Sequence, residues 1–276
     1  MLLSAAASGL AVLAVTWLAD RLGGTLGGLL ATAPVTSAAA LLFLAGSSPN
    51  AEVGGNLLEG GRSLLAALLA MPVYFLFLKH TTGWLRTRIL VGLTLFIAVF
   101  TGGTLWFGTF GAPGWLWILL IGALSVLYLF TFLQMHIPPQ LLRGPKPHMD
   151  AKEAALRFLA GAGVILLVAW LRETQPALST AWAIFPGTYL VTLGVLGFGH
   201  GAAYSGRACQ GGALGGVPLA TYLVVLHLVL PLREGLPWAV LAQLPAWLAY
   251  FAVLIPLWRW RQRVLAPKVP RTPEAA

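Results

Sequence analysis

Two apolar stretches of the chain each carry a proline near the middle, with hydroxyl side chains beside it. The first stretch, residues 23–46, holds Pro34, and the second, residues 176–199, holds Pro186. The hydroxyls are those of Thr32, Thr36, Ser37, Thr188 and Thr192. Inside a helix, proline removes a backbone N–H and displaces the carbonyl four residues earlier, which here belongs to Leu30 or Trp182. In hydrocarbon these carbonyls need another partner. The pattern predicts a substrate-binding site for a small solute or ion, and the alternative is two kinked helices packed through small residues.

Three ionisable residues are candidates for coupling an ion to that site. Asp20 and Glu173 end two of the apolar stretches, and His227 lies within a third. Ionisable groups inside membrane segments are functional candidates. The alternatives are carboxylates solvated at the membrane surface and a histidine with an ordinary hydrogen bond.

The sequence predicts no catalytic residue, no metal site and no cofactor. It contains no nucleophile motif, phosphate-binding loop or dinucleotide fingerprint. The five histidines and the one cysteine, Cys209, lack the spacing of metal ligands. An enzyme is therefore disfavoured, and an intramembrane enzyme acting on a lipid-linked substrate remains the third alternative.

Composition places the chain in a membrane. Of its 276 residues, 58% are hydrophobic and 9% are charged, with a mean hydropathy of +0.84. Soluble proteins carry about 25% charged residues, so the prediction is an all-α integral membrane protein. The net charge of +9 follows the membrane topology described next, and we expect no nucleic-acid partner.

Nine apolar runs predict nine transmembrane helices. Their ranges are 2–19, 25–46, 61–79, 86–107, 114–134, 153–171, 178–198, 209–230 and 236–258. In this arrangement fourteen of the 17 Lys and Arg residues lie on one side, and cytoplasmic loops are the ones enriched in these residues. The prediction is an N-terminus outside and a C-terminus in the cytoplasm. The segment at 199–212 is expected to be a Gly-rich cytoplasmic connection.

Weak matches between the two halves of the chain predict an inverted 4+1+4 repeat. Residues 15–20 match 168–173 at an offset of 153, and Pro34 matches Pro186 at an offset of 152, which places Thr36 on Thr188. The expected parts are a first four-helix repeat, a linker helix with a cytoplasmic connector, a second repeat and a basic cytoplasmic tail. These occupy residues 1–107, 108–152, 153–258 and 259–276. Inverted repeats are common in secondary transporters, whose sites lie between the repeats.

The run at 27–46, the Gly-containing loop at 54–62 and the run at 71–78 together resemble the GlpM family of small four-span bacterial inner-membrane proteins. This chain is about twice as long, so the resemblance implies a duplicated and fused unit. It also implies a multi-pass protein of the bacterial inner membrane. It transfers no site residue.

The sequence thus predicts a secondary transporter or exporter of a small solute or ion that works by alternating access. The expected partners are that solute or ion, membrane lipids and a second copy of the chain in a homodimer. A protein of another class, a non-transporting accessory scaffold for envelope polysaccharide or lipid assembly, is the main alternative.

Overall fold

The computed structural model describes residues 2–22, 24–81, 84–135, 151–184 and 187–265. Within these residues the chain is all-helical, as its composition predicts. The α-helices are α1 (Leu2–Leu22), α2 (Gly24–Ala31), α3 (Val35–Ala45), α4 (Asn50–Asn56), α5 (Gly61–His80), α6 (Leu85–Gly108), α7 (Gly114–Phe130), α8 (Ala151–Thr174), α9 (Pro176–Ile184), α10 (Gly187–His200), α11 (Ala202–Leu214), α12 (Gly216–Val229) and α13 (Leu236–Leu265). Short 3₁₀ turns, η1 (Phe132–Gln134) and η3 (Leu230–Leu232), follow α7 and α12.

The helices have the length and apolar character of a multi-pass membrane protein. In the described part of the chain, six are long and apolar enough to cross a membrane, or seven if the bent pair α11–α12 is one span. The first and seventh predicted spans correspond to the shorter apolar helices Ala5–Ala19 and Thr188–Gly199. The count of nine spans and the orientation of the termini stay predictions.

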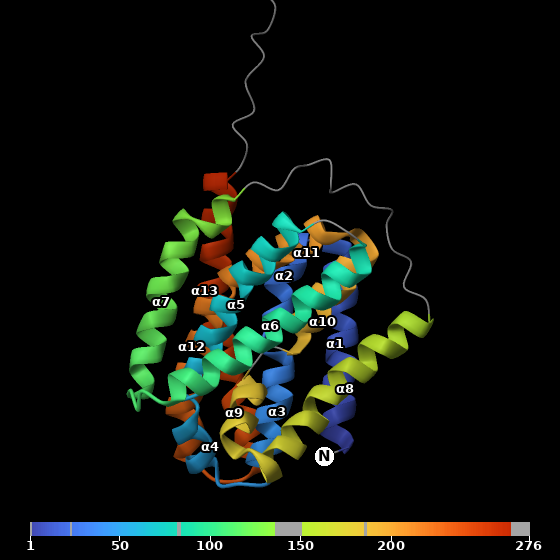
Figure 1. Ribbon diagram of the computed structural model, residues 1–276. Coiled ribbons are helices and arrows are strands. Elements are labelled where there is room, and N and C mark those ends of the chain that lie inside the picture. Colours follow the sequence, from blue (N-terminus) through green and yellow to red (C-terminus); the bar gives the residue numbers. More distant parts are fainter. Residues whose placement is uncertain (1, 23, 82–83, 136–150, 185–186, 266–276) are drawn as a thin grey trace, which may run out of the picture.

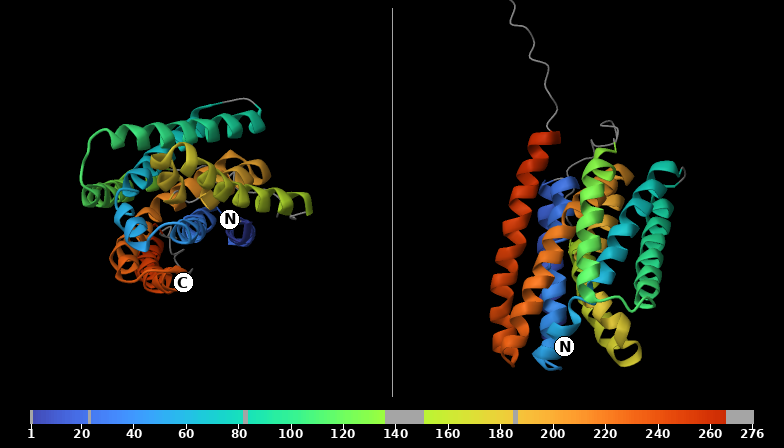
Figure 2. Two further views of the ribbon diagram at one scale, coloured as in Figure 1. Left: turned by 90° about the horizontal axis from the view of Figure 1, so that it is seen from below. Right: turned by 90° about the vertical axis from the view of Figure 1, so that its left-hand side faces the viewer.

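Broken helices occupy the middle of the molecule, and long helices surround them. In Figure 1, α2 lies above α3 while α9 lies below α10, so the two broken runs cross in opposite directions. In the side view of Figure 2, α13 (red) and α6 (teal) stand at opposite edges, with the blue α2–α3 run between them. The outer helices expose large apolar side chains, such as Leu119 on α7 and Leu248 on α13, as helices facing lipid do.

The segment predicted as a Gly-rich cytoplasmic connection is instead helical, and this prediction was wrong. Helix α11 begins at Ala202, after Gly201, whose φ of +94° suits glycine and separates α11 from α10. Glycine disfavours an isolated helix, but here glycine and other small residues let α11 approach α2 closely. A β-carbon at Gly28 of α2 would lie 1.9 Å from the Ala208 carbonyl oxygen of α11. Tertiary packing thus outweighs local propensity.

Two further boundaries differ from the sequence prediction. Helix α4 forms in the loop between the second and third predicted spans, and the Glu234 carboxylate accepts hydrogen bonds from the backbone N–H groups of Asn50 and Ala51 at its start. A carboxylate at a helix N-terminus is favourable because four N–H groups there lack helical partners. Helix α13 continues to Leu265, through part of the predicted tail. The connector at 136–150 lies outside the described residues.

Candidate functional site

Both proline-bearing runs are broken helices. The first run changes from α2 to α3 across residues 32–34, and Pro34 directly precedes α3. The second changes from α9 to α10 across residues 185–186, so Pro186 lies outside the described residues. Each break leaves backbone N–H and C=O groups without helical partners, and these must be satisfied within the protein. Polar backbone is therefore available at the centre of each run.

The two breaks meet through a pair of threonines. The Thr188 hydroxyl donates to Thr36 Oγ1 at 3.1 Å, and the Thr188 backbone N–H points to the same oxygen at 3.4 Å. Both residues are buried, with exposed fractions of 1% and 0%. Thr36 is also the middle residue of the candidate span Gly27–Ala45. One hydroxyl from the first run thus caps the start of α10 in the second.

A second hydroxyl of the first run caps the end of α9. The Ser37 hydroxyl donates to the Ile184 carbonyl oxygen at 3.0 Å, and this is the last residue of α9. Thr192 donates to the Thr188 carbonyl oxygen at 2.8 Å, one turn into α10. We name Thr36, Ser37, Thr188 and Thr192 the hydroxyl cluster. Its bonds come from hydroxyls, a backbone amide and backbone carbonyls, a set suited to binding a polar solute or ion.

The carbonyl expected to be released by Pro34 finds a partner in its own turn. The Leu30 carbonyl oxygen accepts a hydrogen bond from the Ala33 backbone N–H at 3.0 Å. At the other break a hydroxyl does bind a carbonyl at a helix end, since Ser37 donates to the Ile184 carbonyl oxygen. The expectation for Trp182 depends on Pro186, outside the described residues. The Trp182 ring makes a T-shaped contact with Phe100 of α6, at 5.3 Å between ring centroids.

Thr32 lies one helical turn before the hydroxyl cluster and contacts a different helix. Its hydroxyl donates to the Leu29 carbonyl oxygen at 2.6 Å. A β-carbon on Gly215, between α11 and α12, would lie 1.8 Å from Thr32 Oγ1. The glycine therefore lets the bent pair α11–α12 close against the first break. Thr32 thus belongs to the break and contacts Leu29, Gly215 and Tyr250.

The three ionisable candidates are dispersed. Asp20 is in the last turn of α1, and its side chain is outside what the structure describes. Glu173 is exposed at the end of α8. The Nδ1 atom of His227 lies 2.7 Å from the Gly54 carbonyl oxygen of α4, the helix at the lower end of the molecule in Figure 1. No described hydrogen bond joins Glu173 or His227 to the hydroxyl cluster.

Buried tyrosines form polar contacts that the sequence reasoning missed. The Tyr74 hydroxyl of α5 lies 2.7 Å from the Ser205 hydroxyl of α11, which donates to the Leu193 carbonyl oxygen at 2.8 Å. Tyr189 of α10 donates to the Cys209 carbonyl oxygen at 3.3 Å. Tyrosines at the ends of spans are explained by the membrane interface. These two lie well inside predicted spans, and that position was a usable signal.

Two tyrosines of the last helix pair provide a matched test of this polar packing. The Tyr222 hydroxyl of α12 donates to Gln243 Oε1 of α13, whereas the buried Tyr250 hydroxyl faces Thr32 without a well-formed hydrogen bond in the described structure. We expect Tyr222→Phe to lower the free energy of unfolding by about 1–3 kcal/mol, because it leaves a buried acceptor unsatisfied. Tyr250→Phe should cost less, because the contact of its hydroxyl with Thr32 is not a well-formed hydrogen bond.

Thermal unfolding of the two variants in the same detergent, with the wild-type protein alongside, measures this difference. Both substitutions remove one oxygen from a fully buried ring, so side-chain volume changes equally. Equal losses of stability in Tyr222→Phe and Tyr250→Phe would contradict the prediction. The Tyr222–Gln243 hydrogen bond would then make no net contribution to the free energy of unfolding.

Known proteins do not identify the chain. No family model, curated protein or solved structure matches it. Among the described residues, no group of three or more His, Cys, Asp or Glu side chains is placed to hold a metal ion. The structure thus defines a class, an all-helical protein with several potential membrane spans and a buried polar centre. The resemblance to the GlpM family stays a prediction.

Proposed function

We propose that the chain is a secondary transporter or exporter of a small solute or ion, and that the hydroxyl cluster is its binding site. The observation that carries the proposal is the meeting of two broken helices through Thr36 and Thr188. Discontinuous helices place backbone groups where they can contact solutes and ions at the membrane midplane. The proposed setting is the bacterial inner membrane, with the C-terminus in the cytoplasm.

The contacts across the molecule support two inverted four-helix units. Thr36 contacts Thr188 at a separation of 152 residues, and Ser8 donates to the Gly161 carbonyl oxygen at 2.9 Å at a separation of 153. These separations equal the offsets between the two halves of the sequence. A residue can contact its own counterpart only where a two-fold axis passes between them. Both contacts therefore fit one pseudo-two-fold axis between the units.

The outer helices follow the same relation. Helix α6 packs on α10 and α13 packs on α3, so each unit's last helix covers the broken helix of the other unit. In Figure 1, α1 rises from the N-terminus while α8 descends from the connector. Opposite directions are what inverted repeats require. Rocking of one unit against the other would then open the hydroxyl cluster to either side of the membrane.

Labelling of introduced cysteines by a membrane-impermeant maleimide tests the proposal in native membranes. The substitutions are Thr32→Cys, Thr36→Cys, Thr188→Cys and Thr192→Cys, each made alone. A transporter should admit reagent to Thr36→Cys and Thr188→Cys, because alternating access hydrates the site for part of the time. The native Cys209 is buried, so the wild-type protein gives the background.

A control at a packed position makes the result decisive. Ala67 of α5 is fully buried at 0% exposure, and Ala67→Cys should stay unlabelled in folded protein. Protection of all four threonine positions at the level of Ala67→Cys would remove the proposed site. That outcome would favour the accessory scaffold for envelope polysaccharide or lipid assembly, which needs no water-accessible centre.

A further inference from the structure

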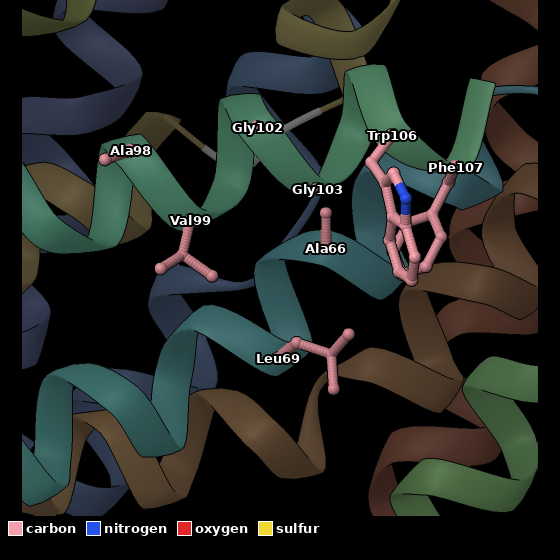
Figure 3. Close-up of a pocket in the computed structure, with 8 residues that line it drawn as sticks. All are labelled: Ala66, Leu69, Ala98, Val99, Gly102, Gly103, Trp106 and Phe107. Atoms are coloured by element: carbon pink, nitrogen blue, oxygen red, sulfur yellow. The ribbon is translucent and has the colours of Figure 1, made fainter. Parts of the chain in front are cut away.

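An apolar groove of about 390 Å³ runs between α5 and α6. Figure 3 shows Ala66 and Leu69 on its α5 side, with Gly102 and Trp106 on its α6 side. A β-carbon on Gly102 would meet nothing within 4 Å, so the groove is open there. Both helices are candidate membrane spans, and α6 is mostly exposed. The groove therefore faces the region where lipid chains would lie.

A positive charge lies at one end of this groove. Arg62 is the second residue of α5, and its Nη1 atom is 3.2 Å from where a β-carbon would stand on Gly108, the last residue of α6. Trp106, two residues before Gly108, lines the groove and is 59% exposed. No hydrogen bond or ion pair joins the Arg62 guanidinium to another described residue. The negative end of the α6 dipole attracts the Arg62 guanidinium and explains its position. The five N–H donors of the guanidinium still have no acceptor among the described residues.

We propose that the groove binds one acyl chain of an anionic phospholipid and that Arg62 holds its phosphate. The planar guanidinium matches phosphate oxygens in a bidentate geometry. The ten helical rises from Ala98 to Gly108 of α6 span about 15 Å. That length is about half of a ~30 Å hydrocarbon core. A headgroup at Arg62 therefore places its chain along the groove within one leaflet.

Native mass spectrometry of the detergent-purified full-length protein tests the site. The protein is titrated with phosphatidylglycerol and, separately, with phosphatidylcholine carrying the same acyl chains. We expect one phosphatidylglycerol to bind about tenfold more tightly than phosphatidylcholine, because the choline cation of phosphatidylcholine neutralises its phosphate and is repelled by Arg62. Arg62→Gln should remove this preference. Gly102→Leu should weaken binding of both lipids, because its side chain enters the groove.

Matched variants separate the site from general effects of charge and fold. Arg233→Gln removes a basic residue that stacks on Trp238 at 5.3 Å, and it should keep the preference for phosphatidylglycerol. Gly122→Leu adds the same side chain at a glycine of α7 that is likewise open, and it should bind both lipids normally. The proposal is overturned if Arg62→Gln keeps the preference or Gly102→Leu binds both lipids as the wild type does. It is also overturned if the groove proves to be covered by a second copy, seen as a dimer that Gly102→Leu dissociates.

Discussion

Gly28→Ala is expected to lower the free energy of unfolding by about 3 kcal/mol, the upper end of the range for an overpacked core. The added β-carbon would lie 1.9 Å from the Ala208 carbonyl oxygen and 2.5 Å from the Ala208 carbonyl carbon. Both atoms belong to the backbone of α11, so no side-chain rotation relieves the clash. Helices α2 and α11 must separate, and this separation moves the first break away from the bent pair α11–α12.

Thermal unfolding in detergent, followed by tryptophan fluorescence, measures this effect against two control substitutions. Gly102→Ala on α6 and Gly122→Ala on α7 add the same methyl group where nothing lies within 4 Å. Alanine is favoured over glycine within a helix by about 1 kcal/mol, so these controls should be as stable as the wild type or more stable. A Gly28→Ala protein as stable as the controls would show that α2 and α11 are not in this close contact.

The broken centre of the fold was predictable because proline acts through local geometry. Pro34 cannot continue a helical hydrogen-bond ladder, and α2 indeed ends three residues before it, at Ala31. Thr36 and Thr188 each lie two residues after a proline, and this equal spacing predicts that they are counterparts in the two halves of the chain. Their hydrogen bond agrees with that pairing. Local geometry and the predicted repeat were therefore enough to pair Thr36 with Thr188.

Other parts of the fold depend on contacts between distant residues, which a single sequence does not display. Helix α11 contains Gly206, Gly211 and Gly212, and glycine disfavours a helix, so the sequence predicts a loop there. Its nine buried residues from Ser205 to Leu214 form a helix because α2, α5 and α10 surround them. The same limit applies to Arg157, counted in the sequence with the cytoplasmic charges. It lies inside α8 at 1% exposure and forms an ion pair with Glu153.

The contact between the two proline-bearing runs, at Thr36 and Thr188, gives a second prediction with a large effect. Thr36→Val should lower the free energy of unfolding by about 2–3 kcal/mol. Among the described residues, Thr36 is the acceptor for both the Thr188 hydroxyl and the Thr188 backbone N–H, and an unsatisfied buried donor costs about 1–3 kcal/mol. Thr188→Val should cost less, because the Thr188 backbone N–H still faces Thr36 Oγ1.

A double-mutant cycle isolates this contact from the other effects of each substitution. In the Thr36→Val, Thr188→Val protein no hydroxyl donor is left stranded, so the combined loss should be smaller than the sum of the single losses by about 1 kcal/mol. Thr221→Val serves as the control partner, because the Thr221 hydroxyl bonds only within its own helix, to the Val217 carbonyl oxygen at 3.0 Å. Its loss should add to that of Thr36→Val. Additive losses for Thr36 and Thr188 would contradict this prediction. They would mean that the surrounding packing holds the two breaks together, and that the hydroxyl cluster does not link the two proline-bearing runs.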